Sequence, residues 1–164
     1  MIASLVSGNA PAQTLWRGVE AGASPAQVRA AVPDAAPPPA LTTLADGETD
    51  DLVTRAIPWG DRLVEVRFFF REARLAAVQL APVGVRAGDT AANRRLAHDL
   101  ADDISAEHGA PYECGDKDYA DVALYECKWL SQPLVIRLWY EDVGGQAPTL
   151  RIAIRKAGDI SYDF

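Results

Sequence analysis

Trp59 and the stretch Val64–Phe70 (VEVRFFF) recur in altered form as Trp129 and the stretch Leu134–Tyr140 (LVIRLWY). At a constant offset of 70 residues, tryptophan matches tryptophan, arginine matches arginine, and the apolar and aromatic positions coincide. Alternating apolar residues within such a stretch are typical of a strand with one buried face. The repetition predicts a scaffold assembled from two similar units, and no catalytic signature accompanies it.

Further strands are predicted on both sides of these stretches, at 52–57, 75–80, 122–130 and 150–155. The short connection Arg71–Arg74 favours an antiparallel hairpin. One helix is predicted ahead of each set of three strands. The first begins at Ser24–Gln27 (SPAQ), a capping box with proline at the first helical position. The second spans about 90–108, carries one apolar stripe, and ends before Gly109.

Each half therefore has the order helix, then three strands, which predicts the α+β class. The expected architecture is a two-layer sandwich, an antiparallel sheet with helices on one face, made of two diverged helix-plus-three-strand repeats. The first α/β repeat is expected at residues 1–88 and the second at 89–164. Residues 33–50 carry Pro37–Pro39 and are predicted to be a loop within the first repeat and the best linker candidate.

The net charge of −7 is unevenly placed, because residues 99–126 hold nine carboxylates against Lys117 alone. Such a field repels nucleic-acid backbones, so no nucleic-acid partner is expected. No apolar run reaches the roughly 18 residues of a membrane helix, so no transmembrane segment is expected. The acidic region is predicted to be a solvated face, although it could also meet a basic partner or a cation.

Cys114 and Cys127 bear on the cellular compartment in which the protein resides. A disulfide between them closes a loop of about 14 residues and contributes roughly 3 kcal/mol by the loop-entropy relation. It would suit an oxidising compartment such as a bacterial periplasm. Two unpaired core cysteines in a cytosolic protein fit the sequence as well. The segment Met1–Gln13 lacks the basic start and the long apolar stretch of a signal peptide. Because Ala10–Ala12 (APA) resembles the end of one, a trimmed export signal or a misplaced start codon also fits.

Strand alternation also predicts a binding face. If Leu134, Ile136 and Leu138 face the helices, the intervening side chains and their counterparts on neighbouring strands face the other way. Tryptophan and arginine are the residue types that anchor protein interfaces. The residues expected to contact a protein partner on this face are Trp129, Arg137, Trp139, Arg151 and Arg155. An ordinary solvated sheet surface, or a face buried between the two halves of the chain, fits the same pattern.

No catalytic residues, metal or cofactor are expected. His98 and His108 lie on one helix and have no serine or cysteine at a known nucleophile spacing. Together with Cys114 and Cys127 they fit no closed zinc pattern, which usually begins with two ligands two to four residues apart. The group Asp116, Asp118 and Asp121 resembles part of a calcium loop, but the required glycine and distal glutamate are missing.

The run Gly22–Val28 (GASPAQV), then Pro33, and later Phe68–Phe70 leading to Leu75 is similar to the SmpA/OmlA type of outer-membrane assembly lipoprotein domain. The doubled form resembles the tandem architecture of β-lactamase inhibitory protein. This chain departs from the pattern in lacking the glycine before Pro33 and a lipidated cysteine near its start. The resemblance implies a non-catalytic, protein-binding domain of the bacterial envelope.

Three function hypotheses follow. The first is a non-enzymatic binding or scaffold domain of a bacterial protein. It requires that the tryptophans and arginines of the predicted face are exposed. The second is a small inhibitor or immunity-type protein that blocks a basic partner with Asp116, Asp118 and Asp121. The third is a hydrolase or metal enzyme that uses His98 or His108, and it requires a concave pocket holding a histidine. The expected location is the periplasm or cell envelope, with the cytoplasm as the alternative.

Overall fold

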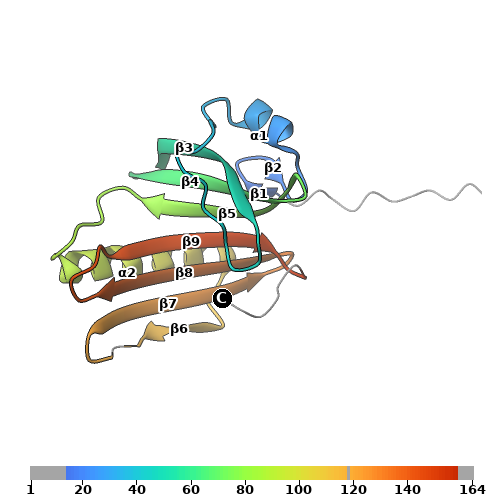
Figure 1. The fold of residues 1–164 in the computed structure, drawn as a ribbon. Helices are drawn as coiled ribbons and strands as arrows, with labels where there is room; N and C mark the ends of the chain where they lie inside the picture. The colour runs from blue at the N-terminus through green and yellow to red at the C-terminus, as the bar shows by residue number, and fades with distance from the viewer. Residues whose placement is uncertain (1–13, 118, 159–164) are drawn as a thin grey trace, which may run out of the picture.

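The computed structural model describes residues 14–117 and 119–158. Within these residues, seven strands form one antiparallel sheet in the order β3-β4-β5-β9-β8-β7-β6, and β1 and β2 form a small hairpin. The long helix α2 lies behind the sheet in the view of Figure 1. The elements in chain order are β1 (Thr14–Trp16), β2 (Val19–Glu20), α1 (Pro25–Ala31), β3 (Thr49–Trp59), β4 (Arg62–Arg71), β5 (Arg74–Pro82), α2 (Thr90–His108), β6 (Glu113–Asp116), β7 (Val122–Ser131), β8 (Leu134–Val143) and β9 (Thr149–Lys156).

The predicted fold class is wrong, because the chain is mainly β rather than a sandwich of helix-plus-strand repeats. The helices in the described part of the chain are only 7 and 19 residues long. Of these, α1 buries only Val28 and touches β2, so it does not form a helical layer over the large sheet. The error arose because β1, β2 and β6 are 3, 2 and 4 residues long, too short to show a period-two pattern.

The two halves of the chain are joined in a single sheet. The third strand of the first half, β5, pairs with the last strand of the second half, β9, through Ala77 opposite Arg155 and Leu80 opposite Ile152. The predicted boundary between residues 88 and 89 falls in the connection between β5 and α2. One hydrophobic core therefore runs along the whole helix-side face of the sheet.

Helix α2 covers the second half of that face. It spans Thr90–His108, as its apolar stripe predicted, and it buries Ala97, Leu100 and Ile104. Gly109 follows the helix with a φ of 84°, a backbone conformation that glycine adopts without the strain a side chain would cause. The capping box at Ser24 is also present, with Gln27 and Ser24 bonding each other's backbone N–H groups.

The predicted loop before β3 is a loop, and it is fixed to the sheet rather than hanging free as a spacer. Ala36 and Val53 exchange backbone hydrogen bonds of 2.9 and 2.8 Å. The loop then crosses β5 and β9 on the face opposite α2 (Figure 1). Glu48, at its end, is fully buried. The loop therefore covers one half of the face that carries no helix.

Candidate functional site

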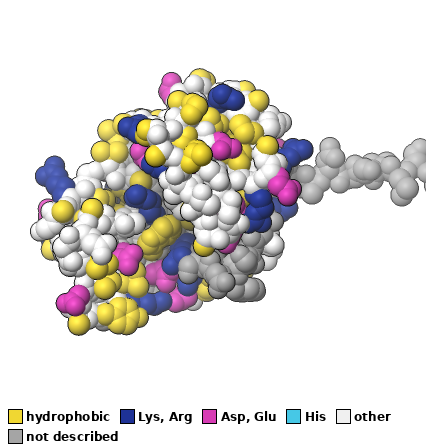
Figure 2. All heavy atoms as spheres, in the orientation of Figure 1, with side chains coloured by type: hydrophobic (Ala, Val, Ile, Leu, Met, Phe, Trp, Pro, Cys, Tyr) yellow, Lys and Arg dark blue, Asp and Glu magenta, His cyan; other side chains and the backbone are white. Residues whose placement is uncertain are grey.

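The other half of that face, over β7, β8 and β9, is the predicted binding surface. Figure 2 shows it in the orientation of Figure 1, as a depression beside the loop that contains hydrophobic, basic and acidic side chains. Strand register places these side chains on one side of the sheet, since Glu126 lies opposite Trp139 and Trp139 opposite Arg151. We call this surface the open face and define it by Glu126, Lys128, Val135, Arg137, Trp139 and Arg151.

Arg137 and Trp139 form the centre of the open face. The Arg137 guanidinium carbon lies 5.1 Å from the centroid of the Trp139 ring, a distance at which cation–π attraction is favourable. The Nε of Arg137 also donates to Glu126 Oε1 at 2.5 Å. The hydrogen bond to Glu126 therefore holds the Arg137 guanidinium against the half-buried Trp139 ring.

Glu126 is the anion that neutralises most of the positive charge here. Lys117 Nζ donates to its Oε2 at 3.1 Å, and Lys128 Nζ lies 3.6 Å from the same oxygen. Burial by itself raises the pKa of Glu126, but the hydrogen bond from Lys117 and the charge of Arg137 outweigh it, so that the pKa lies below its ordinary value. Glu126 is therefore ionised and fully engaged by its own neighbours.

Arg151 differs from these residues because it forms no ion pair within the described ranges 14–117 and 119–158. It is half-buried, and among the described residues its Nη1 donates only to the carbonyl of Leu150, at 3.0 Å. Burial, and after it the charge of Arg67, lower the pKa of Arg151, while Glu65 acts weakly in the opposite direction. A half-buried guanidinium without a carboxylate is energetically costly, and an incoming anion would relieve that cost.

Arg155 faces the predicted side but lies beneath the loop. Its Nη1 donates to Asp46 Oδ2 at 2.7 Å and to Glu48 Oε1 at 3.1 Å. Arg71 Nη2 donates to the same Glu48 oxygen at 2.9 Å. Burial nevertheless raises the pKa of Glu48 above its ordinary value, against the charges of Arg155 and Arg71. Arg155 therefore fastens the loop to the sheet and is not available to a partner.

The predicted orientation of Trp129 is wrong. Its side chain is fully buried on the helix-side face, where Nε1 donates to Ser105 Oγ of α2 at 3.2 Å. Trp129 lies opposite Ile136, which fixes both side chains on the same side of the sheet. The sequence does contain a sign of the correct orientation: Glu126 and Lys128 alternate with apolar neighbours, which identifies the charged positions as the outward ones.

Cys114 and Cys127 are at disulfide distance. They lie directly opposite each other on β6 and β7, with their Cα atoms 4.0 Å apart. Cys127 is buried, whereas Cys114 lies on the exposed edge strand. The pair therefore ties the short β6 to the rest of the sheet.

The acidic stretch and His98 meet at the same edge. His98 stacks on Tyr125 with ring centroids 4.1 Å apart, and its Nε2 lies 3.8 Å from Asp116. Asp116 also lies 3.5 Å from Arg94, while Asp118 is outside the described residues. Within the described ranges, no group of three or more metal-ligating side chains comes together.

His108 has a neighbour that sequence reasoning missed. Ser131 Oγ lies 3.2 Å from His108 Nδ1, and Glu107 Oε1 lies 3.8 Å from Nε2. The serine is brought there by the end of β7, so sequence spacing could not reveal it. Although His108 lines a cavity, Ser131 does not, and Glu107 is beyond hydrogen-bonding distance of the imidazole. The arrangement therefore lacks the geometry of an activated nucleophile.

Comparison of the chain with protein-family models, curated proteins and solved structures finds no match. In the part of the chain that the structure describes, neither helix has both the length and the apolar character that a membrane crossing demands. Any function proposed for this chain therefore depends on the residues of the site.

Proposed function

We propose that this chain is a non-catalytic protein-binding domain that holds an acidic segment of a partner protein on its open face. The observation that carries the proposal is Arg151, a half-buried guanidinium that has no carboxylate within ion-pair distance among the described residues. A carboxylate of the partner would accept two hydrogen bonds from it.

The surroundings of Arg151 favour a protein segment over an isolated anion. Trp139 lies opposite Arg151 on β8 and is held by Arg137 at 5.1 Å. Leu130 is 55% exposed, and it lies opposite Val135 on the same face. An apolar side chain of the partner can pack on this surface while a neighbouring acidic side chain reaches Arg151.

The acidic alternative has less support from the geometry. Asp116 already lies against Arg94 and His98, so its charge is partly compensated within the chain. An inhibitor that presents a free acidic patch would leave Asp116 without a cationic neighbour.

We further infer that the protein acts in the envelope of a bacterium. The cysteine pair at disulfide distance suits an oxidising compartment. The bias of thirteen arginines against three lysines suits a GC-rich bacterial genome. Trapping free thiols with an alkylating agent in intact cells tests the location: unreacted cysteines support it, and two alkylated cysteines contradict it.

The binding proposal is tested with a random-peptide display library selected on the purified domain. Enriched peptides should combine acidic and apolar residues. Arg151→Met should weaken the best peptide at least tenfold, since a hydrogen bond to a charged group contributes about 1.5–3 kcal/mol. The matched control is Arg95→Met, which removes the same charge from an exposed position on α2, on the other side of the sheet.

Two results contradict the proposal. One is enrichment of peptides without acidic residues. The other is equal weakening by Arg151→Met and Arg95→Met, which would show that only the net charge of the domain matters.

A further inference from the structure

A cavity of about 390 Å³ lies on the helix-side face of the sheet, opposite to the open face. It is enclosed by β1, the end of β3 and the last turn of α2, and β8 and β9 form its floor. Its volume falls within the range of small-molecule sites. The floor is aliphatic and consists of Leu134, Ile136, Ile152 and Ile154.

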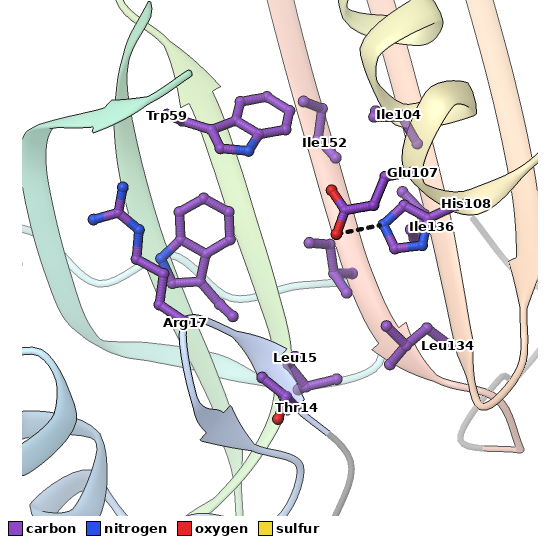
Figure 3. Close-up of a pocket in the computed structure, with 12 residues that line it drawn as sticks. Thr14, Leu15, Arg17, Trp59, Ile104, Glu107, His108, Leu134, Ile136 and Ile152 are labelled. Atoms are coloured by element: carbon purple, nitrogen blue, oxygen red, sulfur yellow. Dashed lines mark ion pairs between the residues drawn. The ribbon is translucent and has the colours of Figure 1, made fainter. Parts of the chain in front are cut away.

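One wall of the cavity is aromatic. Trp16 and Trp59 meet edge to face, with ring centroids 6.1 Å apart and an interplanar angle of 65°. Arg17 lies 5.4 Å from the Trp16 ring and donates to the carbonyl of Pro58. Figure 3 shows the Arg17 guanidinium on the far side of Trp59 from Ile152. Arg17 is therefore itself part of the cavity lining, and its guanidinium supports the aromatic wall at the Trp16 ring.

The opposite wall carries a carboxylate. Glu107, in the last turn of α2, extends over Ile152 toward Trp59 (Figure 3). His108 Nε2 lies 3.8 Å from Glu107 Oε1, on the side away from Trp59. Within residues 14–117 and 119–158, no lysine or arginine lies within ion-pair distance of Glu107. Glu107 therefore contributes negative charge to the cavity.

We propose that this cavity binds an organic cation, an ammonium group attached to an apolar body. The ammonium would lie between the Glu107 carboxylate and the faces of the tryptophans, which attract cations through their ring quadrupoles. The apolar body would rest on the isoleucine floor. Anionic ligands are disfavoured because the Glu107 carboxylate lies beside the isoleucine floor, whereas the Arg17 guanidinium lies beyond the tryptophans from that floor (Figure 3). The net charge of −7 also favours the approach of cations.

The proposal is independent of the open face, since it uses the other side of the sheet. It is tested with three probes of similar shape: phenethylamine, the neutral 2-phenylethanol and the anionic 3-phenylpropionate. Each is titrated into the full chain, and the indole N–H resonances of its tryptophans are followed by NMR. Phenethylamine should shift the resonances of Trp16 and Trp59 and leave those of Trp129 and Trp139 in place.

The matched variants are Glu107→Gln and Asp99→Asn, which remove the same charge from exposed positions on α2. Only Glu107 lines the cavity. Glu107→Gln should weaken phenethylamine binding about fivefold, and Asp99→Asn should leave it within about twofold. Because both positions are exposed, neither variant threatens folding.

Three outcomes overturn the proposal. The first is the absence of shifts at Trp16 and Trp59 at millimolar phenethylamine. The second is binding of the neutral alcohol as tightly as the amine, which would identify an apolar site without charge recognition. The third is an equal effect of the two variants.

Discussion

Reduction of the Cys114–Cys127 bond should destabilise the protein by about 3 kcal/mol. The two cysteines are 13 residues apart in sequence, so the bond closes a loop of about 14 residues. The loop-entropy relation gives about 10 cal/mol/K for a loop of this size, which is about 3 kcal/mol at 25 °C. That amount is a large share of the roughly 5–15 kcal/mol by which most domains are stable.

Urea unfolding of the oxidised and the reduced protein measures the effect without changing any side chain. The reductant has access, because Cys114 lies on the exposed edge strand. The fluorescence of Trp129, which is fully buried against α2, reports the loss of the core. The unfolding midpoint should fall by roughly 1–3 M urea, given the usual dependence of stability on denaturant.

The control is the double variant Cys114→Ala with Cys127→Ala. Its unfolding curve should be the same with and without reductant, and its stability should lie near that of the reduced protein. A difference below about 1 kcal/mol between oxidised and reduced protein would refute the reasoning, because the loop-closure entropy would then have been overestimated. A reductant effect that persists in the double variant would refute it as well.

Three further predictions concern buried and paired groups. Arg155→Met should lower the free energy of unfolding by about 3 kcal/mol, because it leaves Glu48 buried with fewer cations. Since the pKa of Glu48 is raised in the folded protein, ionisation of Glu48 opposes folding as the pH rises above the ordinary pKa of a glutamate. The loss measured by chemical unfolding should therefore be smaller at pH 5 than at pH 8. Glu113 should titrate with a pKa of about 2 in NMR, since hydrogen bonds from Lys117 and Lys128 lower that pKa. The contribution of Glu113 to stability should be lost as the pH falls below the ordinary pKa of a glutamate, and Lys117→Gln should raise the pKa of Glu113. Trp129→Phe should cost about 2 kcal/mol of unfolding free energy through the lost hydrogen bond and the cavity left behind, and an unchanged unfolding midpoint would contradict the buried placement.

Side-chain alternation was a good guide for the strands whose two faces differ clearly in polarity. On β8, Leu134, Ile136 and Leu138 face the helix as expected, and Arg137 and Trp139 face away. On β7 the prediction failed because Trp129 was taken as an outward residue. Tryptophan suits both a core and an interface, so residue type alone does not determine its side.

The binding surface could be predicted only in part. Arg137, Trp139 and Arg151 lie on the open face, as the pattern indicated, whereas Arg155 is buried beneath the loop. The burial depends on Glu48, which is 107 residues away in sequence. A local sequence pattern cannot predict a contact between residues so far apart, because the contact stabilises the protein only after the sheet has brought the two residues together.

The sequence by itself determined the local elements: the long helix that ends before Gly109, the capped start at Ser24, and the alternating strands on either side of each short turn. These follow from backbone capping and from the two periodicities of helix and strand, which act over a few residues. Only the tertiary structure decided that the strands join in one sheet through β5 and β9, that the loop covers half of its free face, and that Trp16, Trp59 and Glu107 surround one cavity. These arrangements depend on hydrogen bonds and packing between distant segments, and a strand pattern is compatible with many partners until the burial of the whole core selects one.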